Sequence, residues 1–398
     1  MTGAASVSNI GLVGGSVTGQ SNIGSLVGWL DTGAVVQTSF SSAAVTGTGI
    51  NNTGGLIGFN AGTVQSSYAS GAVTGIYGTG ALVGWNVFTV TNSYATGAVT
   101  GVQYTGGLIG INAGNVSGSH ATGAVTGTGT GATAIDTGGL IGYHQSGTVY
   151  GSHASGAVTG PQNVGGLIGV SAGLVQASYA TGAVKKTGDR TGGLIAQNLG
   201  TLQNSYATGT VSGTTKTGGL VGLNSPGGTV SSSYATGTVT GVVATTGGLM
   251  GLNNGAASAV TSSYWDTLTT GLGISAGGAG AVGLTTAQLQ GALPTGFSNT
   301  VWSTGAGLYP YLNWQFALGT TPQSLSGIAH QANGTALAGA VLAGSVNGAA
   351  FAGATGANGY YYLLLPQGTT GQGSGIFIDI AGNAVKANDY VRGAFGSS

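Results

Sequence analysis

Short apolar runs separated by glycine recur along most of the chain, and they lack the period of a helix. In residues 54–75, which read GGLIGFNAGTVQSSYASGAVTG, the apolar residues gather at positions 56–60, 63–69 and 72–74. β-Branched and aromatic residues fill these runs, and glycine or small polar residues separate them, which is typical of short strands joined by tight corners. No run repeats apolar residues at i, i+3, i+4 and i+7. The pattern therefore predicts three short strands in this segment.

The same pattern occurs nine times. The leucine of its G-G-L core recurs at intervals of 26 to 32 residues. The nine leucines are Leu26, Leu56, Leu82, Leu108, Leu140, Leu167, Leu194, Leu220 and Leu249. The extra residues collect between the V-T-G end of one copy and the G-G-L of the next, as in the longest insertion, residues 128–136. A fixed period with its length variation in one loop predicts a repeat architecture.

A single repeat of this size cannot bury its own apolar face, whereas a stack of repeats can. Three strands per repeat with glycine corners describe one coil of a parallel β-helix. We therefore predict an all-β fold, in which residues 1–275 form a right-handed parallel β-helix, or β-solenoid, of about nine to ten coils. With about 4.8 Å per coil, the array would be roughly 45–50 Å long.

Equivalent positions of the repeats form columns that favour stacking. The residue four after the core leucine predicts a hydrogen-bonded asparagine ladder. Its members are Asn60, Asn86, Asn112, His144, Ser171, Asn198, Asn224 and Asn253. An aromatic column, always preceded by serine, comprises Phe40, Tyr68, Tyr94, His120, His153, Tyr179, Tyr206, Tyr234 and Tyr264. Because alternate residues share a face of a strand, Val64 and Tyr68 are expected to point inward and Gln65 outward.

One column leaves its orientation open, because in the first strand either Leu56 and Asn60 face the core or Ile57 and Phe59 do. The column of Phe59 is apolar but variable in shape, and it contains Gln197 as a polar member. Its other members form a candidate apolar interaction stripe: Trp29, Phe59, Trp85, Ile111, Tyr143, Val170, Leu223 and Leu252. Facing outward, the stripe would be an extended interaction surface. Facing inward, it would be part of the core, which is the interpretation we favour.

Composition narrows the function classes. Charged residues make up 3% of the chain, glutamate is absent and the formal net charge is zero. Nucleic-acid binding needs clustered lysine and arginine that displace counterions. We expect no nucleic-acid partner, because we interpret the one basic cluster, Lys185, Lys186 and Arg190 around Asp189, as a solvated loop. A hydrophobic content of 41% in β-like runs favours packing over disorder. Cysteine is absent, which excludes disulfides and thiolate metal sites.

The sequence predicts neither a membrane-spanning segment nor an export signal within these residues. Glycine or polar residues interrupt every apolar stretch before it is long enough to span a bilayer. The first residues, MTGAASVSNIGLVGG, lack the basic start and unbroken apolar centre of a signal peptide. We therefore expect a fragment of a longer protein whose export signal lies elsewhere.

Catalytic constellations are missing, so we predict a protein that is not an enzyme and that uses no cofactor or metal. Without glutamate, the H-E-x-x-H zinc site cannot form. The six aspartates are scattered singly, unlike the paired carboxylates of glycosidases. His120 and His153 fall in the aromatic column of adjacent copies and could together hold a metal, but no third ligand is evident, so a ring ladder is the favoured interpretation.

A weaker alternative concerns the threonines of the third strand. Thr208 with Thr210, and Thr236 with Thr238, form T-x-T pairs in adjacent copies, as in β-helices that bind ice. In most other copies the second threonine is alanine, as at Ala72 and Ala98, and this interruption makes ice binding a remote alternative.

The repeat closely resembles the GLUG motif, whose copies read approximately G-G-L-V-G-x-N-x-G-x-V-x-x-S-Y-A-T-G-x-V. The match covers about residues 24–264. GLUG arrays occur in large bacterial surface and secreted proteins, including filamentous-haemagglutinin-like adhesins of the two-partner-secretion or autotransporter type and some IgA-cleaving metallopeptidases. The resemblance implies a stalk or surface solenoid that carries no catalytic site.

The chain after the array divides into two further parts. Residues 276–320 contain a short expected helical turn at 285–290 and an aromatic cluster that we expect to cap the last coil. The aromatic residues are Trp302, Tyr309, Tyr311, Trp314 and Phe316. Residues 321–398 alternate apolar runs with Asn-Gly turns that begin at Asn333, Asn347 and Asn358, which are hairpin signals. This part resembles an Ig-like or carboxypeptidase-regulatory-like β-sandwich, which need not be complete.

Together these features predict a segment of a non-enzymatic bacterial adhesin, exposed on the outer cell surface or secreted, that attaches to a host cell or an environmental surface by multivalent contact. Glycans are among the candidate ligands, and the parent protein would need an outer-membrane transporter. The alternative is a structural filament or biofilm-matrix protein that self-associates, because neutral charge and exposed β surface favour association. A glycan-active β-helix is a more remote alternative.

Overall fold

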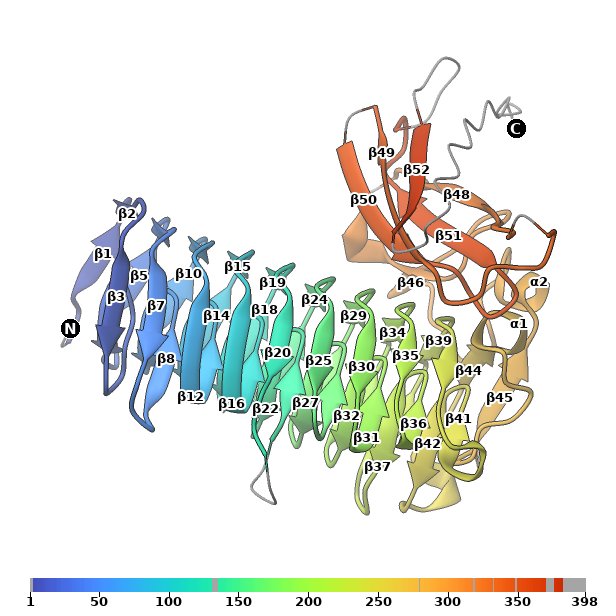
Figure 1. Cartoon of the computed structure of the whole chain (residues 1–398), viewed down its shortest axis with the longest axis horizontal. Coiled ribbons are helices and arrows are strands. Elements are labelled where there is room, and N and C mark those ends of the chain that lie inside the picture. Colours follow the sequence, from blue (N-terminus) through green and yellow to red (C-terminus); the bar gives the residue numbers. More distant parts are fainter. Residues whose placement is uncertain are drawn as a thin grey trace.

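The computed structural model describes residues 3–130, 135–278, 280–317, 319–331, 333–347, 349–369 and 376–381. Stacked parallel strands form a β-solenoid of about nine turns, as predicted (Figure 1). The turns advance from the N-terminus to residue 284, and a smaller β unit lies beside the last turns. Equivalent residues of successive repeats pair in register, as in Tyr68 with Tyr94.

Four parallel sheets run along the array. Sheet A comprises β1 (Ser6–Ser8), β5 (Val35–Gln37), β10 (Thr63–Gln65), β14 (Thr89–Thr91), β18 (Asn115–Ser117), β23 (Thr148–Tyr150), β28 (Leu174–Gln176), β33 (Thr201–Gln203), β38 (Thr229–Ser231) and β43 (Val260–Thr261). Sheet B comprises β2 (Gly11–Leu12), β6 (Phe40–Ser41), β11 (Tyr68–Ala69), β15 (Tyr94–Ala95), β19 (His120–Ala121), β24 (His153–Ala154), β29 (Tyr179–Ala180), β34 (Tyr206–Ala207), β39 (Tyr234–Ala235), β44 (Ser263–Asp266) and β45 (Ala281–Leu284).

Sheet C has an outer limb and an inner limb, which are joined within the long strands β12 (Val73–Gly80) and β16 (Val99–Gly106). The outer limb adds β3 (Ser16–Gly19), β7 (Ala44–Gly47), β20 (Val125–Gly127), β25 (Val158–Gly160), β30 (Val184–Lys186), β35 (Val211–Ser212) and β40 (Val239–Thr240). The inner limb adds β8 (Asn52–Gly54), β21 (Thr137–Gly138), β26 (Val164–Gly165), β31 (Asp189–Gly192), β36 (Thr215–Gly218) and β41 (Thr246–Gly247).

Sheet D follows the G-G-L corner of each repeat. Its strands are β4 (Val27–Leu30), β9 (Ile57–Asn60), β13 (Val83–Asn86), β17 (Ile109–Asn112), β22 (Ile141–His144), β27 (Ile168–Ser171), β32 (Ile195–Asn198), β37 (Val221–Asn224) and β42 (Met250–Asn253). Each turn therefore contributes one more limb than the three strands that the sequence predicts.

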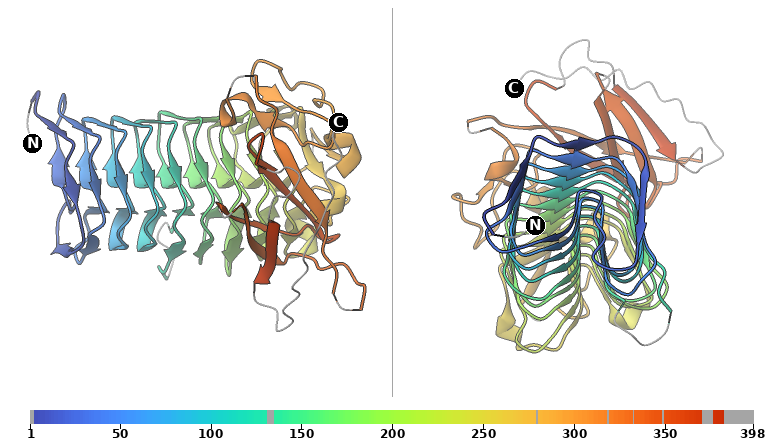
Figure 2. Two further views of the ribbon diagram at one scale, coloured as in Figure 1. Left: turned by 90° about the horizontal axis from the view of Figure 1, so that it is seen from above. Right: turned by 90° about the vertical axis from the view of Figure 1, so that its left-hand side faces the viewer.

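The end-on view shows why the extra limb exists, because each turn folds into two lobes with a notch between them (Figure 2). The inner limb of sheet C returns against sheet D at glycine contacts. A Cβ added to Gly58 would lie 2.3 Å from the carbonyl carbon of Asn22. Inside the narrow lobe, a Cβ added to Gly75 would lie 2.5 Å from the hydroxyl of Thr79. Gly58 therefore lets two backbone layers touch, and Gly75 leaves room for the threonine side chain opposite it.

The core fills the wide lobe and settles the orientation of the first strand. Leu56, Ile57 and Asn60 are all buried, whereas Phe59 is only partly buried. Neither alternative drawn from strict alternation describes this strand, because the glycine contact at Gly58 places adjacent residues Leu56 and Ile57 on the buried side together. Polar residues are buried as well: a column of threonines, such as Thr53 and Thr79, lies in the narrow lobe.

The aromatic column faces outward, contrary to the prediction that Tyr68 points inward with Val64. Val64, Ser67 and Ala69 are buried, and Tyr68 lies on the outer face. A left-handed residue between sheets A and B breaks the alternation in every turn, with φ from 44° to 58°. These residues are Asn9, Thr38, Ser66, Asn92, Gly118, Gly151, Ala177, Asn204, Ser232 and Ser262. Because this bend shifts the parity by one, serine and alanine turn inward and the ring turns outward.

Two polar ladders run inside the solenoid. From Ser67 to Ser233, each serine hydroxyl of this column donates to a carbonyl two residues earlier and accepts from the serine amide of the preceding turn, as Ser67 does from Ser39. The predicted asparagine ladder is confirmed: Asn60 donates to Asn86 at 2.6 Å and Asn86 to Asn112 at 2.6 Å. A stack of identical amides thus satisfies its own buried donors and acceptors.

His144 and Ser171 interrupt the asparagine ladder. Nδ1 of His144 lies 3.0 Å from the amide nitrogen of Asn112, while Nε2 of His144 is buried without a partner. Burial lowers the pKa of His144 to about 4, because the charged imidazolium cannot be solvated there. The ladder resumes at Asn198, which donates to Asn224 at 2.8 Å.

Trp265 closes the C-terminal end of the array. It replaces the small inward residue of sheet B, where Ala235 is its partner, and its ring covers Gly248. Its indole nitrogen donates to the carbonyl of Leu272 at 2.8 Å. The hydroxyl of Ser275 bonds the backbone of Met250. The cap is thus formed by Trp265 and the loop after it; the predicted aromatic cluster lies elsewhere, as described below.

The remaining elements connect and follow the cap. The helices are α1 (Thr267–Thr270), α2 (Thr286–Leu289), and the 3₁₀ turns η1 (Val243–Thr245), η2 (Ala257–Ala259) and η3 (Asn313–Gln315). α2 confirms the helical turn expected at 285–290. β46 (Trp302–Ser303) pairs with β47 (Tyr311–Leu312). The C-terminal unit has two antiparallel sheets, β48 (Gln323–Ile328) with β51 (Tyr360–Leu365), and β49 (Val341–Val346) between β50 (Ala349–Ala354) and β52 (Ile376–Ala381).

Replacing Thr38 by glycine tests the left-handed bend. Thr38 is exposed, and its φ of 49° is unfavourable for a β-branched residue. We expect Thr38→Gly to stabilise the chain by about 1 kcal/mol, measured as a higher midpoint of denaturant unfolding. The neighbouring Gln37→Gly, in extended backbone, is the matched control and should destabilise. Equal losses from both substitutions would contradict a strained bend.

His144 makes the stability of the solenoid depend on pH. The unfolded chain takes up a proton at His144 near pH 6.5, whereas the folded chain does so only near pH 4. Stability contributed by the neutral ring is therefore present above pH 6.5 and lost as the pH falls toward 4, by about 3 kcal/mol for a shift of this size. His144→Asn should flatten this part of the stability–pH curve, as followed by thermal unfolding. An unchanged slope between pH 4 and 6.5 would contradict the assignment.

Candidate functional site

A continuous ladder of aromatic rings runs along the outer face of sheet B. From Phe40 to Tyr234, neighbouring rings stack with centroids 4.7–5.1 Å apart and planes within 7° of parallel. His120 and His153 stack in the middle of this ladder, 4.8 Å apart. The ring faces cover one another, so edges and hydroxyls are what the ladder presents outward.

A second column consists of serines and threonines, each of which lies two residues after the ring residue of the same turn. Its members are Ser70, Thr96, Thr122, Ser155, Thr181, Thr208 and Thr236. They change from exposed at Ser70, Thr96, Thr122 and Ser155 to half-buried at Thr181 and Thr208, and Thr236 is buried. The gradient arises because the last turns are covered by the rest of the chain.

The aromatic segment between α2 and the C-terminal unit packs sideways on this ladder. Trp302 lies on Tyr206 and Tyr234, with centroids 6.1 and 5.8 Å away, and Trp314 lies on His153 and Tyr179 at 6.2 and 5.8 Å. This contact corrects the expectation that the segment caps the last coil. Because the ladder lies on the outside of the solenoid, its ring edges form an apolar surface along one side, and the aromatic segment packs on that surface.

Hydrogen bonds fix the segment in place. The Trp314 indole donates to the carbonyl of Ala177 at 2.8 Å, and the side-chain amide of Gln315 donates to the hydroxyl of Tyr206 at 2.7 Å. The hydroxyl of Tyr234 donates to the carbonyl of Pro310 at 2.6 Å. Tyr309 lies further along and donates to the buried Asp266 carboxylate at 2.6 Å.

The C-terminal unit is anchored over the same face. The hydroxyl of Thr238 donates to the carbonyl of Thr355 at 3.0 Å, and the amide of Ala357 donates to Thr269 at 2.7 Å. Tyr362 of β51 meets Tyr309 edge to face, with centroids 4.9 Å apart. β51 passes above the ladder, and on its other side Leu325 and Leu363 of the same sheet pack against Val346 of β49.

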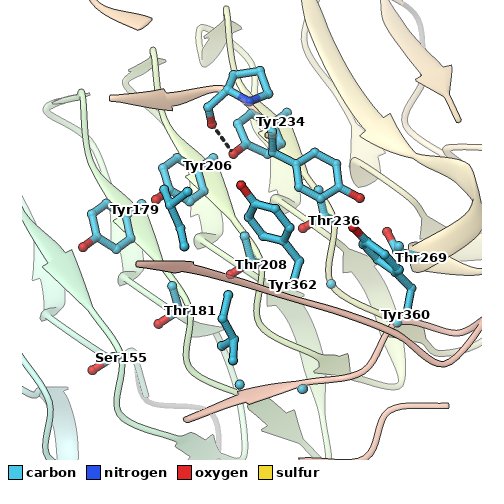
Figure 3. Close-up of a pocket in the computed structure, with 18 of the residues that line it drawn as sticks. Ser155, Tyr179, Thr181, Tyr206, Thr208, Tyr234, Thr236, Thr269, Tyr360 and Tyr362 are labelled. Atoms are coloured by element: carbon cyan, nitrogen blue, oxygen red, sulfur yellow. Dashed lines mark hydrogen bonds between the residues drawn. The ribbon is translucent and has the colours of Figure 1, made fainter. Parts of the chain in front are cut away.

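A cleft of about 370 Å³ remains between the ladder and the C-terminal unit (Figure 3). Its floor consists of the rings from His153 to Tyr234 and of the hydroxyl column from Ser155 to Thr236. Its roof consists of β50 and β51, including Tyr360, Tyr362 and Leu363 to Leu365. A volume of this size is within the range of small-ligand sites, and we take it as the candidate functional site.

The cleft is lined without fixed charge. Its described lining residues include no aspartate, lysine or arginine, and His153 is the one residue among them that could become a cation. Burial, and then the neighbouring His120, lower the pKa of His153 to about 4. At neutral pH the site is therefore an uncharged surface of rings, hydroxyls and aliphatic side chains.

The candidate apolar stripe lies in the notch between the two lobes, away from this cleft. Ile111, Val170 and Leu223 are buried there, and Phe59, Trp85, Tyr143 and Leu252 are partly buried. Trp29, in the first complete turn, is 48% exposed. The stripe mostly packs against the inner limb of sheet C, in a layer distinct from the main core.

Polar residues occupy the same notch where Gln197 replaces an apolar member of the stripe. Arg190 donates to Gln197 and Asn163, each at 3.0 Å, and Asn163 donates to Asp136 at 2.7 Å. Burial raises the pKa of Asp136 to about 6. Lys186 is only 4% exposed, which corrects its interpretation as part of a solvated loop.

The described residues hold no group of three or more histidine or acidic side chains placed to bind a metal ion. His120 and His153 adjoin as ladder members, as the sequence suggested. None of the helices in the described part of the chain has the length and apolar character needed to cross a bilayer.

The site residues that the sequence predicted, those of the stripe, lie in the notch. The sequence did not predict the cleft as a site. Its signal was nevertheless present, because the aromatic column that forms part of the floor recurs in all nine repeats.

Comparison with known proteins gives no relative for the chain. No protein-family model matches it, and it has no significant match among curated proteins or among solved structures.

Proposed function

We propose that this chain is an attachment segment: a rigid rod that carries a binding face along one side, used at a bacterial surface or after secretion. The single observation that supports this best is the ladder of rings and hydroxyls, which repeats one surface pattern in every turn from Phe40 to Tyr234. A repeated surface can make many identical weak contacts, and such contacts multiply in avidity. The GLUG-like repeat agrees with the same proposal, since similar arrays are found in bacterial adhesins.

The rod provides the stiffness that attachment requires. Its core residues are buried in every interior turn, and the serine and asparagine ladders tie neighbouring turns together. Each turn contacts mainly its neighbours, so the binding face keeps a constant spacing along the array. The sparse charge leaves the surface free of long-range repulsion from a target.

A second candidate function, self-association into filaments, is favoured by the N-terminal turn. Its strands β1 to β4 pair on one side only within the described chain. Val13 is 83% exposed and Ile10 42% exposed beside these strand edges, and Val7, Leu12 and Val17 are only partly buried. Exposed strand edges are templates for association with another chain.

Attachment is tested with beads coated with the purified chain at several densities. We expect retention on cells or on glycan-bearing surfaces to rise more steeply than in proportion to coating density, by about tenfold or more at high density, because contacts become multivalent. Beads carrying an unrelated uncharged β-solenoid are the control. Retention equal to that control on every surface would refute the proposal.

Self-association is tested by Val13→Lys. A charge next to the exposed strand edges should prevent pairing between chains, so the variant is expected to sediment as a monomer at concentrations where the unchanged chain forms larger species. Thr89→Lys, on the outer side of sheet A, is the matched control for added charge. If the unchanged chain stays monomeric across the concentration range, the filament alternative is wrong.

A further inference from the structure

The cleft is elongated along the axis of the solenoid. Its floor residues Ser155, Thr181, Thr208 and Thr236 come from four successive turns, and the accompanying rings advance by 4.7, 4.9 and 5.1 Å per turn. The roof strand β51 crosses above these turns rather than running alongside one of them (Figure 3). A ligand that fills the cleft must therefore be long, narrow and able to repeat its contacts at about the spacing of the turns.

The floor offers side-chain hydroxyls and no free backbone amide at its three threonines. The amides of Thr181, Thr208 and Thr236 all donate to carbonyls of the preceding turn. The hydroxyls of Ser155, Thr181 and Thr208 make no hydrogen bond within the described part of the chain, and none of the three residues is fully buried. Since the sheet has no free edge here, a peptide cannot extend it by strand addition, whereas a polyhydroxyl chain can exchange hydrogen bonds with each hydroxyl in turn.

The wall of the cleft also has unsatisfied hydroxyls. Those of Tyr362 and Thr269 are buried without a hydrogen-bond partner. Tyr362 belongs to the roof strand β51 and Thr269 to α1, so hydroxyl groups lie on the wall of the cleft as well as on its floor.

The absence of fixed charge among the described lining residues selects against ionic ligands. A carboxylate or ammonium group brought into the cleft would lose its hydration without gaining a counter-charge. Neutral hydroxyl groups lose less hydration and find matching partners. Tyrosine edges and the aliphatic side chain of Leu364 can cover the apolar face of a sugar ring.

The surface continues beyond the cleft toward the N-terminus. The ring ladder extends through His120, Tyr94, Tyr68 and Phe40, and the hydroxyl column extends through exposed Thr122, Thr96 and Ser70. The C-terminal unit lies only beside the last turns (Figure 1). A ligand can thus lie partly in the cleft and partly along the open ladder, which suits a polymer better than a small molecule.

From these features we propose that the cleft and ladder bind a neutral, linear polysaccharide in an extended, ribbon-like conformation, with one sugar for each turn of the solenoid. Hexopyranoses joined through equatorial bonds advance by a distance similar to the spacing of the rings. This inference names the ligand class of the proposed attachment function and rests on it.

Calorimetry with the full chain and defined oligosaccharides tests the inference. Cellohexaose is the extended neutral probe, maltohexaose is a helical probe of the same composition, and a hexamer of galacturonic acid is the charged probe. We expect cellohexaose to bind at least tenfold more tightly than the other two probes. Among cello-oligosaccharides, we expect affinity to rise steeply from the disaccharide to about the tetramer and only slowly with further sugars. Equal affinities for cellohexaose and maltohexaose, or no binding of any probe, would overturn the inference.

Isosteric substitutions locate the site. Thr181→Val and Thr208→Val each remove one floor hydroxyl and are expected to weaken cellohexaose binding about five- to tenfold. Thr89→Val, on the outer side of sheet A, is the matched control and should bind as the unchanged chain does, and thermal unfolding checks that all three fold. Unaltered binding of cellohexaose by both floor variants would overturn the assignment. It would also be overturned if the cleft bound members of an unstructured peptide library in preference to the oligosaccharides.

The outcomes separate this inference from the proposed function. If coated beads attach to surfaces while no oligosaccharide binds the chain, the attachment function stands and the ligand class is wrong. If cellohexaose binds but coated beads behave as the control beads do, the cleft is a glycan site that does not serve attachment.

Discussion

In-register stacking is the constraint on which the whole molecule depends, because it places every side chain beside its own equivalent at the spacing of a strand pair. Groups that can bond to a copy of themselves benefit: the amide of Asn60 donates to Asn86, and the hydroxyl of Ser67 accepts from Ser39. Like charges would instead repel at every step. This accounts for the near absence of charged residues from the repeat, and it adds to the effect of burial in lowering the pKa of His153 beside His120.

The same stacking turns the outer face into a lattice, and the C-terminal unit converts part of it into a cleft. A left-handed residue in each turn directs the rings outward, and their faces then cover one another. Trp302 and Trp314 use the remaining edges as an apolar surface on which to dock. The site therefore arises where a one-dimensional repeat meets a segment that does not repeat, and neither part alone encloses it.

Much of the solenoid could be predicted from the sequence, because its period and its columns are directly visible there. The asparagine ladder and the ring column follow from identical residues at equal spacing. The outward turn of Tyr68 could not be predicted from alternation, since one left-handed residue, Ser66, shifts the parity. The narrow lobe was missed for a related reason: Gly58 lay inside a predicted strand and Gly75 at a predicted corner, whereas Gly58 contacts the backbone of Asn22 and Gly75 lies against the side chain of Thr79. The cleft was missed because it joins residues that lie far apart in the sequence, such as Thr208 and Leu364.

The direction of the inter-turn hydrogen bonds has a mechanical consequence. These bonds lie along the axis of the rod, so a pulling force applied at the first turn of the array loads them one turn at a time, in the manner of a zipper. Each released turn of 26 residues would add roughly 90 Å of slack chain, at about 3.5 Å per residue. A rod built in this way yields by unwinding in steps, which lengthens the chain and limits the tension along it.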